Sequence, residues 1–185
     1  FLKPNHALAY HNRATAKREL GDLQGALRDY TLATDYKHDF PVAFNNLGSV
    51  KILLGNYTGA IEDYSVAINL DSTFYIAYNN RGSAYYFLGD LELALEDFNK
   101  AILLKEEYSH AMNNKASIFA ANADYESSVS IFNDIIEIDG DFKWAYLNRG
   151  LVKELTGDLE GACADWNKAL DMGVEEASEY VKECN

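Results

Sequence analysis

The residues of this sequence best suited to a chemical role are asparagines that return at a fixed interval. Asn12, Asn46, Asn80, Asn114 and Asn148 are spaced 34 residues apart, with no insertion or deletion between them. An amide side chain donates and accepts hydrogen bonds, and a peptide backbone offers the matching groups. Since the same amide returns once per structural unit, we expect a polar line along one surface, and we interpret that line as a binding track.

In three consecutive units the asparagine belongs to a larger block of polar residues. The blocks are Asn45, Asn46 and Ser49; Asn79, Asn80 and Ser83; and Asn113, Asn114 and Ser117. Asn has only middling helix propensity, so it is a poor choice for solvation alone. We therefore expect the blocks to carry the strongest part of the track, although exposed polar residues more often solvate a protein than bind a ligand.

The sequence offers little that could support catalysis or hold a metal ion or another cofactor. Its four histidines share no metal-ligand spacing with one another or with a cysteine, and it contains no glycine-rich phosphate loop or nucleophile elbow. Aspartates recur at Asp29, Asp63, Asp97 and Asp165. The same residue type recurring once per repeat does not make a catalytic site, because catalysis needs different chemical groups brought close together. We therefore expect no enzymatic activity and no cofactor.

Composition and charge narrow the class of partner. The 185-residue chain has a formal net charge of -13, which argues against nucleic acid as a partner because phosphate binding needs clustered Lys and Arg. No stretch approaches the length needed to cross a bilayer, so we expect a soluble protein without membrane insertion. The expected partner is a protein or peptide, and self-association stays open.

The elements that must position these residues follow the same interval. With Ala7 as position 1, position 8 is always Gly or Ala, position 20 is Ala or Ser, and position 24 is aromatic. Small residues let two helices approach closely, and large ones fill the gaps beside them. Gly at position 15 suits the left-handed residue that ends a helix, and Asp or Asn at position 16 suits the next N-cap. Each unit is thus predicted to be helix, turn, helix; where Ala123 replaces the glycine, we expect Asn122 to be left-handed.

This arrangement of bulky, small, small, aromatic and small residues at positions 4, 8, 20, 24 and 27 resembles the tetratricopeptide repeat (TPR) family. The resemblance implies an all-α fold, a right-handed superhelical α-solenoid of antiparallel helix pairs. Its repeats would be 7–40, 41–74, 75–108, 109–142 and 143–176. The fourth is degenerate because Ser128 and Ile135 stand where the other repeats have Ala. Residues 1–6 would be the tail of a preceding repeat, since Pro4 falls at position 32, and residues 177–185 a capping helix.

The resemblance also gives the track a location and a geometry. In TPR proteins the first helices line a concave groove, and Asn at position 6 resembles the asparagine ladder that grips extended peptide backbones in the O-GlcNAc transferase superhelix. Stacked helices lie ~10 Å apart and an extended peptide advances ~3.3 Å per residue, so five rungs would cover roughly 12–15 residues. The alternative is that Asn at position 6 is merely common in TPR repeats and stabilises its own helix surface.

Apolar residues beside the track could supply selectivity. Ile52, Ile76, Tyr86, Phe87 and Trp144 fall at positions 2, 12 or 13. An exposed aromatic side chain there would be an anchor, and we count Tyr86 among the peptide-binding residues; some of the others could instead pack between repeats. The family's carboxylate clamp needs Lys at position 5 and at a later position 2, and this chain has Lys at neither. We therefore do not expect an adaptor for heat-shock chaperones.

Two further pairings concern the framework more than binding. Arg13, Arg81 and Arg149 at position 7 accompany Asp29, Asp97 and Asp165 at position 23. We expect ion pairs between the two helices of these repeats, because partly buried Arg prefers a planar carboxylate partner. For Cys163 and Cys184 we take two buried thiols as the default and a disulfide as the alternative. The compartment stays open: we favour the cytoplasm, whereas a disulfide would favour an extracytoplasmic compartment.

The sequence therefore predicts a non-enzymatic interaction scaffold whose groove holds an extended peptide or a partner segment. Binding should depend only weakly on salt, because the groove is polar but little charged. Two alternatives remain: a module that self-associates, and a regulatory arm of a larger protein with a domain upstream.

Overall fold

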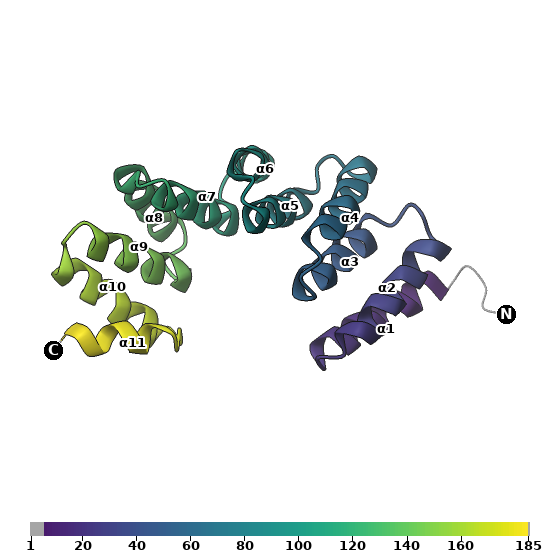
Figure 1. The fold of residues 1–185 in the computed structure, drawn as a ribbon, viewed down its shortest axis with the longest axis horizontal. Coiled ribbons are helices and arrows are strands. Elements are labelled where there is room, and N and C mark those ends of the chain that lie inside the picture. The colour runs from purple at the N-terminus through teal and green to yellow at the C-terminus, as the bar shows by residue number, and fades with distance from the viewer. Residues whose placement is uncertain (1–5, 185) are drawn as a thin grey trace. The chain divides into compact units, whose positions relative to one another are not determined.

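Helix pairs joined by short turns make up the protein (Figure 1). The computed structural model describes residues 6–184. Its first part contains α1 (His6–Glu19), α2 (Leu23–Tyr36), α3 (Pro41–Leu53), α4 (Tyr57–Leu70), α5 (Tyr75–Leu88) and α6 (Leu91–Leu104). Its second part contains α7 (Ser109–Ala121), α8 (Tyr125–Ile138), α9 (Lys143–Leu155), α10 (Leu159–Asp171), α11 (Ala177–Val181) and the 3-10 helix η1 (Lys182–Cys184). Every regular element within residues 6–184 is helical, so the expected all-α fold is confirmed.

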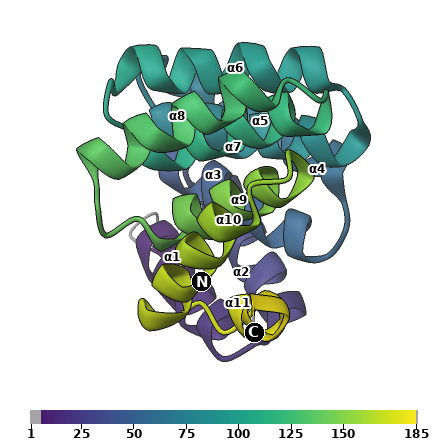
Figure 2. The same cartoon turned by 90° about the vertical axis from the view of Figure 1, so that its left-hand side faces the viewer.

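The chain divides into two compact units between Leu104 and Lys105. We call α1–α6 the N-unit and α7–η1 the C-unit. Within each unit every helix contacts the next one in sequence, as α5 and α6 do in Figure 2. First helices of neighbouring pairs also meet, α3 with α5 and α7 with α9. Because contacts connect neighbours in sequence, each unit has the stacking of an α-solenoid.

Small residues on a first helix receive the aromatic ring of the second, as the pattern at positions 8 and 24 predicts. A Cβ added at Gly48 would meet the Tyr64 ring at 2.8 Å, and one at Gly82 would meet the Phe98 ring at 2.8 Å. Both rings are buried, with at most 2% of their surface exposed. These contacts set how closely the two helices of each pair approach, since a protein interior leaves no slack for another methyl group.

The turn inside each pair depends on one left-handed residue. Gly21, Gly55, Gly89 and Gly157 have φ between 76° and 87°. In the fourth pair the left-handed residue is Ala123, with φ of 61°, and the expectation that Asn122 would take this role is wrong, because its φ is -87°.

Hydrogen bonds in the turn explain this correction. The N–H of Asp124 donates to the Phe119 carbonyl at 2.9 Å, as the N–H of Asp22 does to the Lys17 carbonyl at 2.8 Å. This bond places the left-handed residue directly before the N-cap. Backbone register therefore selects position 123 over the side-chain preference of Asn122. Asp124 then caps α8 by accepting from the N–H of Ser127 at 3.2 Å.

Ion pairs join the two helices of three pairs, as predicted. Arg13 with Asp29, Arg81 with Asp97, and Arg149 with Asp165 each share two parallel hydrogen bonds of 2.6 to 2.8 Å.

The sequence reasoning missed a second cation at position 11. Lys17 lies 2.8 Å from Asp29, Lys153 lies 2.9 Å from Asp165, and Lys51 lies 2.6 Å from Asp63. Asp63 has no arginine beside it because Leu47 occupies position 7 of that repeat.

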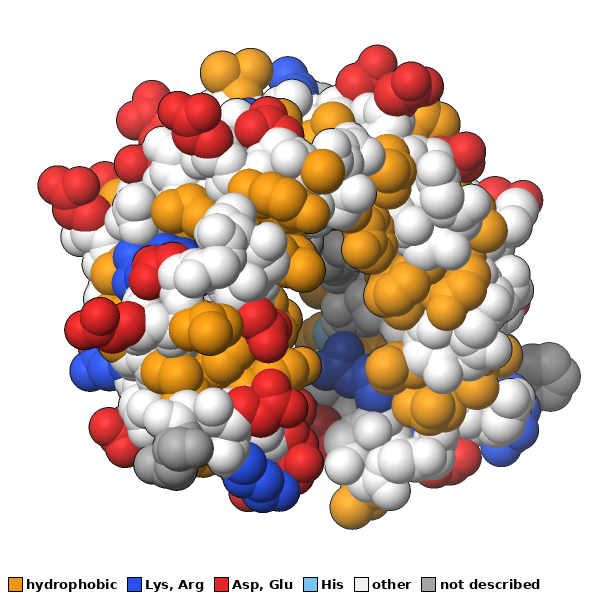
Figure 3. All heavy atoms as spheres, turned by 60° about the vertical axis from the view of Figure 1, so that its left-hand side comes forward, with side chains coloured by type: hydrophobic (Ala, Val, Ile, Leu, Met, Phe, Trp, Pro, Cys, Tyr) orange, Lys and Arg blue, Asp and Glu red, His pale blue; other side chains and the backbone are white. Residues whose placement is uncertain are grey.

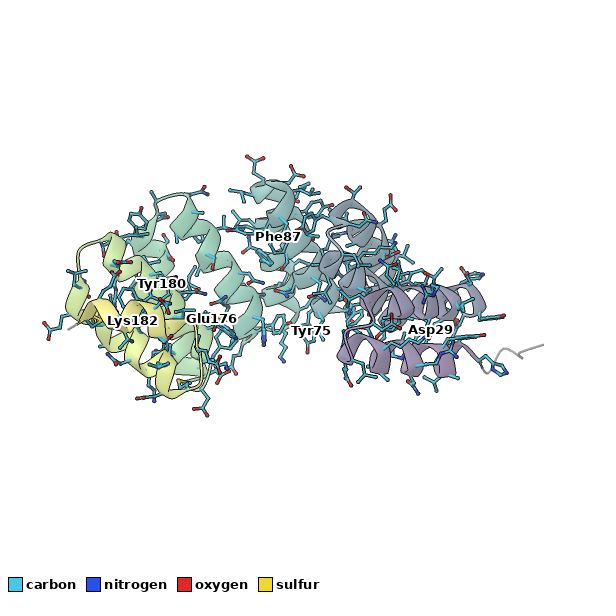
Figure 4. All side chains as sticks on the ribbon, turned by 60° about the horizontal axis from the view of Figure 1, so that its bottom comes forward. Asp29, Tyr75, Phe87, Glu176, Tyr180 and Lys182 are labelled. Carbon is cyan, nitrogen blue, oxygen red and sulfur yellow. A yellow bond between two sulfur atoms is a disulfide. The ribbon has the colours of Figure 1, made fainter. Side chains whose placement is uncertain are left out.

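Charge and burial act in opposite directions on two of these carboxyl groups. Hydrogen bonding from Arg13 lowers the pKa of Asp29 to about 2. Burial raises the pKa of Asp63 above its ordinary value, and Lys51 only partly opposes that effect. Figure 4 shows Asp29 between the two helices of the first pair. The same position in the repeat thus holds a strongly stabilised carboxylate in one pair and a desolvated one in the next.

The C-terminal cap is fastened by a covalent bond. Tyr180 of α11 stacks on Trp166 of α10 with ring centroids 5.1 Å apart, and Tyr180 is labelled in Figure 4. Cys163 and Cys184 form a disulfide, so the default expectation of two buried thiols is wrong. Both cysteines pack beside Trp166 in one apolar cluster, which brings the two sulfur atoms together.

Two sequence expectations concern the ends and surroundings of the chain. The proposed repeat tail at residues 1–6, with Pro4, lies outside the described residues except for His6. Among the helices that are described, none combines the length and the apolar character needed to span a membrane. The boundaries of the five repeats stay a prediction.

Candidate functional site

Asparagines at position 6 bridge neighbouring first helices. An N–H of Asn80 donates to the amide oxygen of Asn45 at 3.0 Å, joining α5 to α3. Asn148 donates to Asn113 in the same way at 2.9 Å, joining α9 to α7. In the first pair of repeats the acceptor is a ring nitrogen, since the Asn46 amide lies 3.0 Å from Nε2 of His11. Each bond connects position 6 of one repeat with position 5 of the repeat before it.

In two of the three doubled asparagine pairs, the first side chain donates a hydrogen bond to the second. Asn45 donates to the amide oxygen of Asn46 at 3.3 Å, and Asn79 donates to that of Asn80 at 3.3 Å. Asn45 and Asn79 are buried, with 6% and 7% of their surface exposed, whereas Asn46 and Asn80 are half-buried. The position 5 amide therefore holds the position 6 amide in one orientation, and the sequence reasoning did not foresee this bond.

The Asn46 amide keeps hydrogen-bonding capacity beyond this network. A primary amide has two N–H donors and two acceptor lone pairs. Asn46 uses one N–H toward His11 and accepts one bond from Asn45. One donor and one acceptor remain beyond these two bonds on a half-buried side chain, which is the complement that an extended backbone presents.

The serines of the blocks are tied to their own helices. Ser49, Ser83 and Ser117 each donate to the carbonyl four residues earlier at 3.0 Å. The hydroxyl of Tyr64 donates to Ser49 at 3.2 Å, and burial raises the pKa of Tyr64 to about 12, so this phenol stays a donor. Thr15 holds the same position in α1 and bonds to the His11 carbonyl at 3.1 Å. The Ser49 hydroxyl thus also connects the two helices of its pair, and contact of the three serines with a peptide stays a prediction.

The remaining predicted residues differ in how far solvent reaches them. Asn12 and Tyr86 are exposed, whereas Asn113, Asn114 and Asn148 are half-buried. The N-unit therefore presents an asparagine row of Asn12, Asn46 and Asn80. The C-unit presents its own row of Asn114 and Asn148.

Apolar side chains flank the asparagines, and the sequence analysis identified only some of them. Phe87 and Trp144 are 56% and 39% exposed, while Ile52 packs against the buried cluster around Tyr64. Leu8, Val42, Leu53 and Leu155 are also exposed at positions 2 and 13. Figure 3 shows apolar side chains that reach the surface at many points of the face drawn. These apolar residues recur at positions 2 and 13 of the 34-residue repeat, so the interval that identified the asparagines could also have identified them.

In α3 and α5 no charged residue lies on the face that carries the asparagines, which consists of positions 2, 5, 6, 9, 12 and 13. In α3 they are Val42, Asn45, Asn46, Ser49, Ile52 and Leu53, and in α5 they are Ile76, Asn79, Asn80, Ser83, Tyr86 and Phe87. Within residues 6–184 no cluster of three His, Cys, Asp or Glu side chains could hold a metal ion. Hydrogen bonding and apolar contact are therefore the chemistry that this face can offer.

Comparison with protein families finds three matches that together span residues 48–142, more than half of the chain. A TPR repeat model matches residues 48–89, and two tetratricopeptide repeat models match residues 75–108 and 109–142. A comparison with curated proteins finds no match.

Solved structures of similar fold include proteins that bind peptides. The crystal structure of MamA is 25% identical, with 89% of this chain and 96% of that chain covered and a TM-score of 0.71. YrrB, described as a TPR protein with an unusual peptide-binding site, is 21% identical, with 96% and 92% covered and a TM-score of 0.66. The first TPR of Spaghetti (RPAP3), bound to the HSP90 peptide SRMEEVD, is 26% identical, with 66% and 97% covered and a TM-score of 0.63.

Proposed function

Since this chain belongs to the tetratricopeptide repeat family, we propose that it is a non-enzymatic scaffold that holds an extended peptide or partner segment along its asparagine row. TPR repeats are generally interaction modules without catalytic activity. The proposed contacts are made by Asn12, Asn46 and Asn80 in the N-unit and by Asn114 and Asn148 in the C-unit. Asn45, Asn79 and Asn113 position these amides, and Ser49, Ser83, Ser117 and Tyr86 lie beside them.

The observation that carries the proposal is the amide network between first helices. Asn46 and Asn80 are held by bonds at 3.0 Å to the preceding repeat and at 3.3 Å to their own neighbour. A side chain that is already ordered loses little conformational entropy when a ligand binds. A row of oriented amides thus supplies hydrogen bonds to a backbone without regard to its side chains.

The comparisons support a peptide ligand but not the same kind of peptide. The peptide bound to Spaghetti ends in two acids among its last three residues. Position 5 of this chain carries His11, Asn45, Asn79, Asn113 and Leu147. Position 5 therefore has no lysine or arginine to pair with an acidic tail.

Replacing Asn46, Asn80 and Asn114 with Ala tests the proposal. Peptides are first selected from a displayed random library on the intact chain, and their affinities are then measured by fluorescence anisotropy. We expect the triple variant to lose at least tenfold in affinity while circular dichroism shows an unchanged helical fold. Asn99→Ala, an exposed asparagine of α6, is the matched control and should bind normally. Equal affinity of the triple variant and the intact chain would refute the asparagine row as the binding site.

Self-association is the competing use of the same surface. Small-angle scattering at several concentrations separates the two functions, because a second copy that occupies the face would raise the apparent mass with concentration. Addition of a selected peptide would then reverse the association.

A further inference from the structure

Two rows of apolar side chains run beside the asparagines of the N-unit. The first row is Leu8, Val42 and Ile76 at position 2, and the second row is Leu53 and Phe87 at position 13. Positions 2, 6 and 13 differ by four and seven residues, so they share one face of a helix. With a rise of about 1.5 Å per residue, the first row lies ~6 Å to one side of the asparagines and the second ~10 Å to the other.

Four of the five residues in these rows are exposed, and Ile76 is half-buried, although the N-unit buries apolar residues elsewhere. Leu8 and Leu53 are each 59% exposed, Phe87 is 56% exposed and Val42 is 43% exposed. Phe87, labelled in Figure 4, stacks on Tyr57 with centroids 5.1 Å apart and an interplanar angle of 17°. Tyr86 also contacts this ring in a T-shaped arrangement, with centroids 6.0 Å apart. Two aromatic neighbours therefore hold Phe87 in place while more than half of its surface stays exposed. Covering such surface is favourable by about 25 cal/mol per Å².

The geometry of an extended chain matches a polar row between two apolar ones. In a strand the backbone N–H and C=O groups point to its two edges, and side chains alternate on the two directions perpendicular to those edges. A strand that presents one edge to the asparagines therefore directs its odd side chains toward one apolar row and its even side chains toward the other. Repeats ~10 Å apart contact roughly every third residue of a bound strand. Residues three apart in a strand point to opposite sides, so successive repeats contact side chains on alternate sides of the peptide.

Charge excludes the other common classes of peptide. Positions 2, 5, 6, 9, 12 and 13 of α3 and α5 have no charged residue, whereas the same positions of α1 include Arg18 and Glu19; the chain has a net charge of -13. An acidic segment would be repelled by the whole protein and would gain no ion pair on α3 or α5. A basic segment would be attracted at long range but would have to desolvate its charges against apolar side chains.

We propose that the N-unit binds an extended, uncharged segment of a partner protein that has apolar side chains on both sides of its backbone. Three asparagine rungs span about 20 Å, which corresponds to roughly six residues. The inference rests on the proposed function, because the asparagine row supplies the backbone contacts, and it adds the class of ligand.

Four labelled peptides test the class of ligand against the full chain. All share an extended core flanked by Ser and Gly: one has apolar residues on both sides, two have Asp on one side or the other, and one has Lys on both sides. Anisotropy should show the apolar peptide binding at least tenfold more tightly than each of the others. If charged and apolar peptides bind equally well, this inference is overturned while the proposed function stands. If no peptide binds, both are overturned.

Variants of the two rows test the location. Val42→Lys and Leu53→Lys each place a cation in one of the two rows. Each substitution should lower the affinity for the apolar peptide about tenfold. A peptide with Asp on the facing side should regain affinity for the matching variant. Leu103→Lys in α6, where the side chain is 72% exposed, is the control and should change neither affinity. Equal losses in the control, or no loss in the row variants, would overturn the assignment.

Discussion

The amide of Asn80 donates to the amide of Asn45 over 3.0 Å, although the two residues are 35 positions apart in sequence. Asn45 in turn donates to Asn46 at 3.3 Å, and Asn46 lies 3.0 Å from the ring of His11. Hydrogen bonds thus connect α1, α3 and α5 across three repeats. The doubled asparagine has a structural role that the surface interpretation alone did not contain.

Asn45→Ala should therefore weaken peptide binding without any contact between Asn45 and the peptide. Removal of the acceptor frees Asn80, and the free energy of unfolding should fall by about 1 kcal/mol, since the half-buried N–H of Asn80 can turn to water. Urea unfolding and anisotropy with a selected peptide measure the two effects. Affinity that is unchanged despite the lost stability would show that the network serves only the framework.

The Arg13–Asp29 pair should make stability depend on pH in a defined window. The pKa of Asp29 is lowered in the folded state from 3.8 to about 2, so the ionised carboxylate stabilises the fold above about pH 4. This contribution is lost as the pH falls toward 2. We expect Asp29→Asn to cost about 1 kcal/mol at pH 7, after allowance for the solvent that screens the exposed Arg13, and progressively less as the pH falls from 4 toward 2. Denaturant unfolding between pH 2 and 7 measures the difference.

Asp63 provides the matched comparison at the same repeat position. Its pKa is raised in the folded state by burial, so its ionised form opposes folding above that pKa, and the penalty disappears as the pH falls below 3.8. Asp63→Asn should therefore cost less stability at pH 7 than Asp29→Asn. A larger loss at Asp63 would show that the contact with Lys51 outweighs desolvation.

Ala123→Gly should stabilise the C-unit. Ala123 has φ of 61°, a conformation that costs an L-residue roughly 1–2 kcal/mol and glycine almost nothing. Because glycine loses more backbone entropy on folding, we expect a net gain of about 1 kcal/mol. The reciprocal change Gly157→Ala should cost a similar amount, since a Cβ there meets nothing within 4 Å and only the backbone is strained. Thermal unfolding measures both variants. A lower midpoint for Ala123→Gly, or a higher one for Gly157→Ala, would contradict the prediction.

Reduction of the Cys163–Cys184 bridge should destabilise the cap. The cysteines are separated by 21 residues, and closing a loop of that size contributes about 3 kcal/mol through the unfolded state. A reducing agent should therefore lower the midpoint of urea unfolding, and a variant with Ser at both positions should not respond to it. Titration with a thiol reagent in denaturant should find no free thiol in the unreduced chain; two free thiols would contradict the bridge.

The contacts that the sequence predicted correctly have both residues in the same helix pair. The interval of 34 residues predicted the helix pairs, and the spacing of Arg81 and Asp97 predicted their contact, because both residues belong to the same pair. The spacing of Asn45 and Asn80 does not show which atom of a neighbouring repeat is within reach, so the bond between them required coordinates. The choice of Ala123 over Asn122 was missed because the register of a backbone bond outweighs side-chain preference.

The candidate site was predicted only in outline. The asparagines were identified because a polar residue that repeats on a helix face stands out, whereas Leu53 and Val42 look like ordinary packing residues. Their exposure depends on how neighbouring helices stack, which no single helix reveals. The disulfide was left as an alternative for the same reason, since the approach of η1 to α10 sets the distance between the two sulfur atoms.

Within the N-unit, the bonds inside a repeat and the bonds between repeats differ in chemistry. Charged groups such as Arg81 and Asp97 fasten the two helices of a pair, and neutral amides such as Asn45 and Asn80 fasten one pair to the next. Arg81 also donates to Ser65 of the preceding pair at 3.0 Å, so its guanidinium takes part in both kinds of contact. Because the Arg81 and Asp97 side chains are largely buried, salt screens their attraction only weakly. Under tension applied to the two ends of the N-unit, the force needed to separate neighbouring helix pairs should therefore change little with ionic strength.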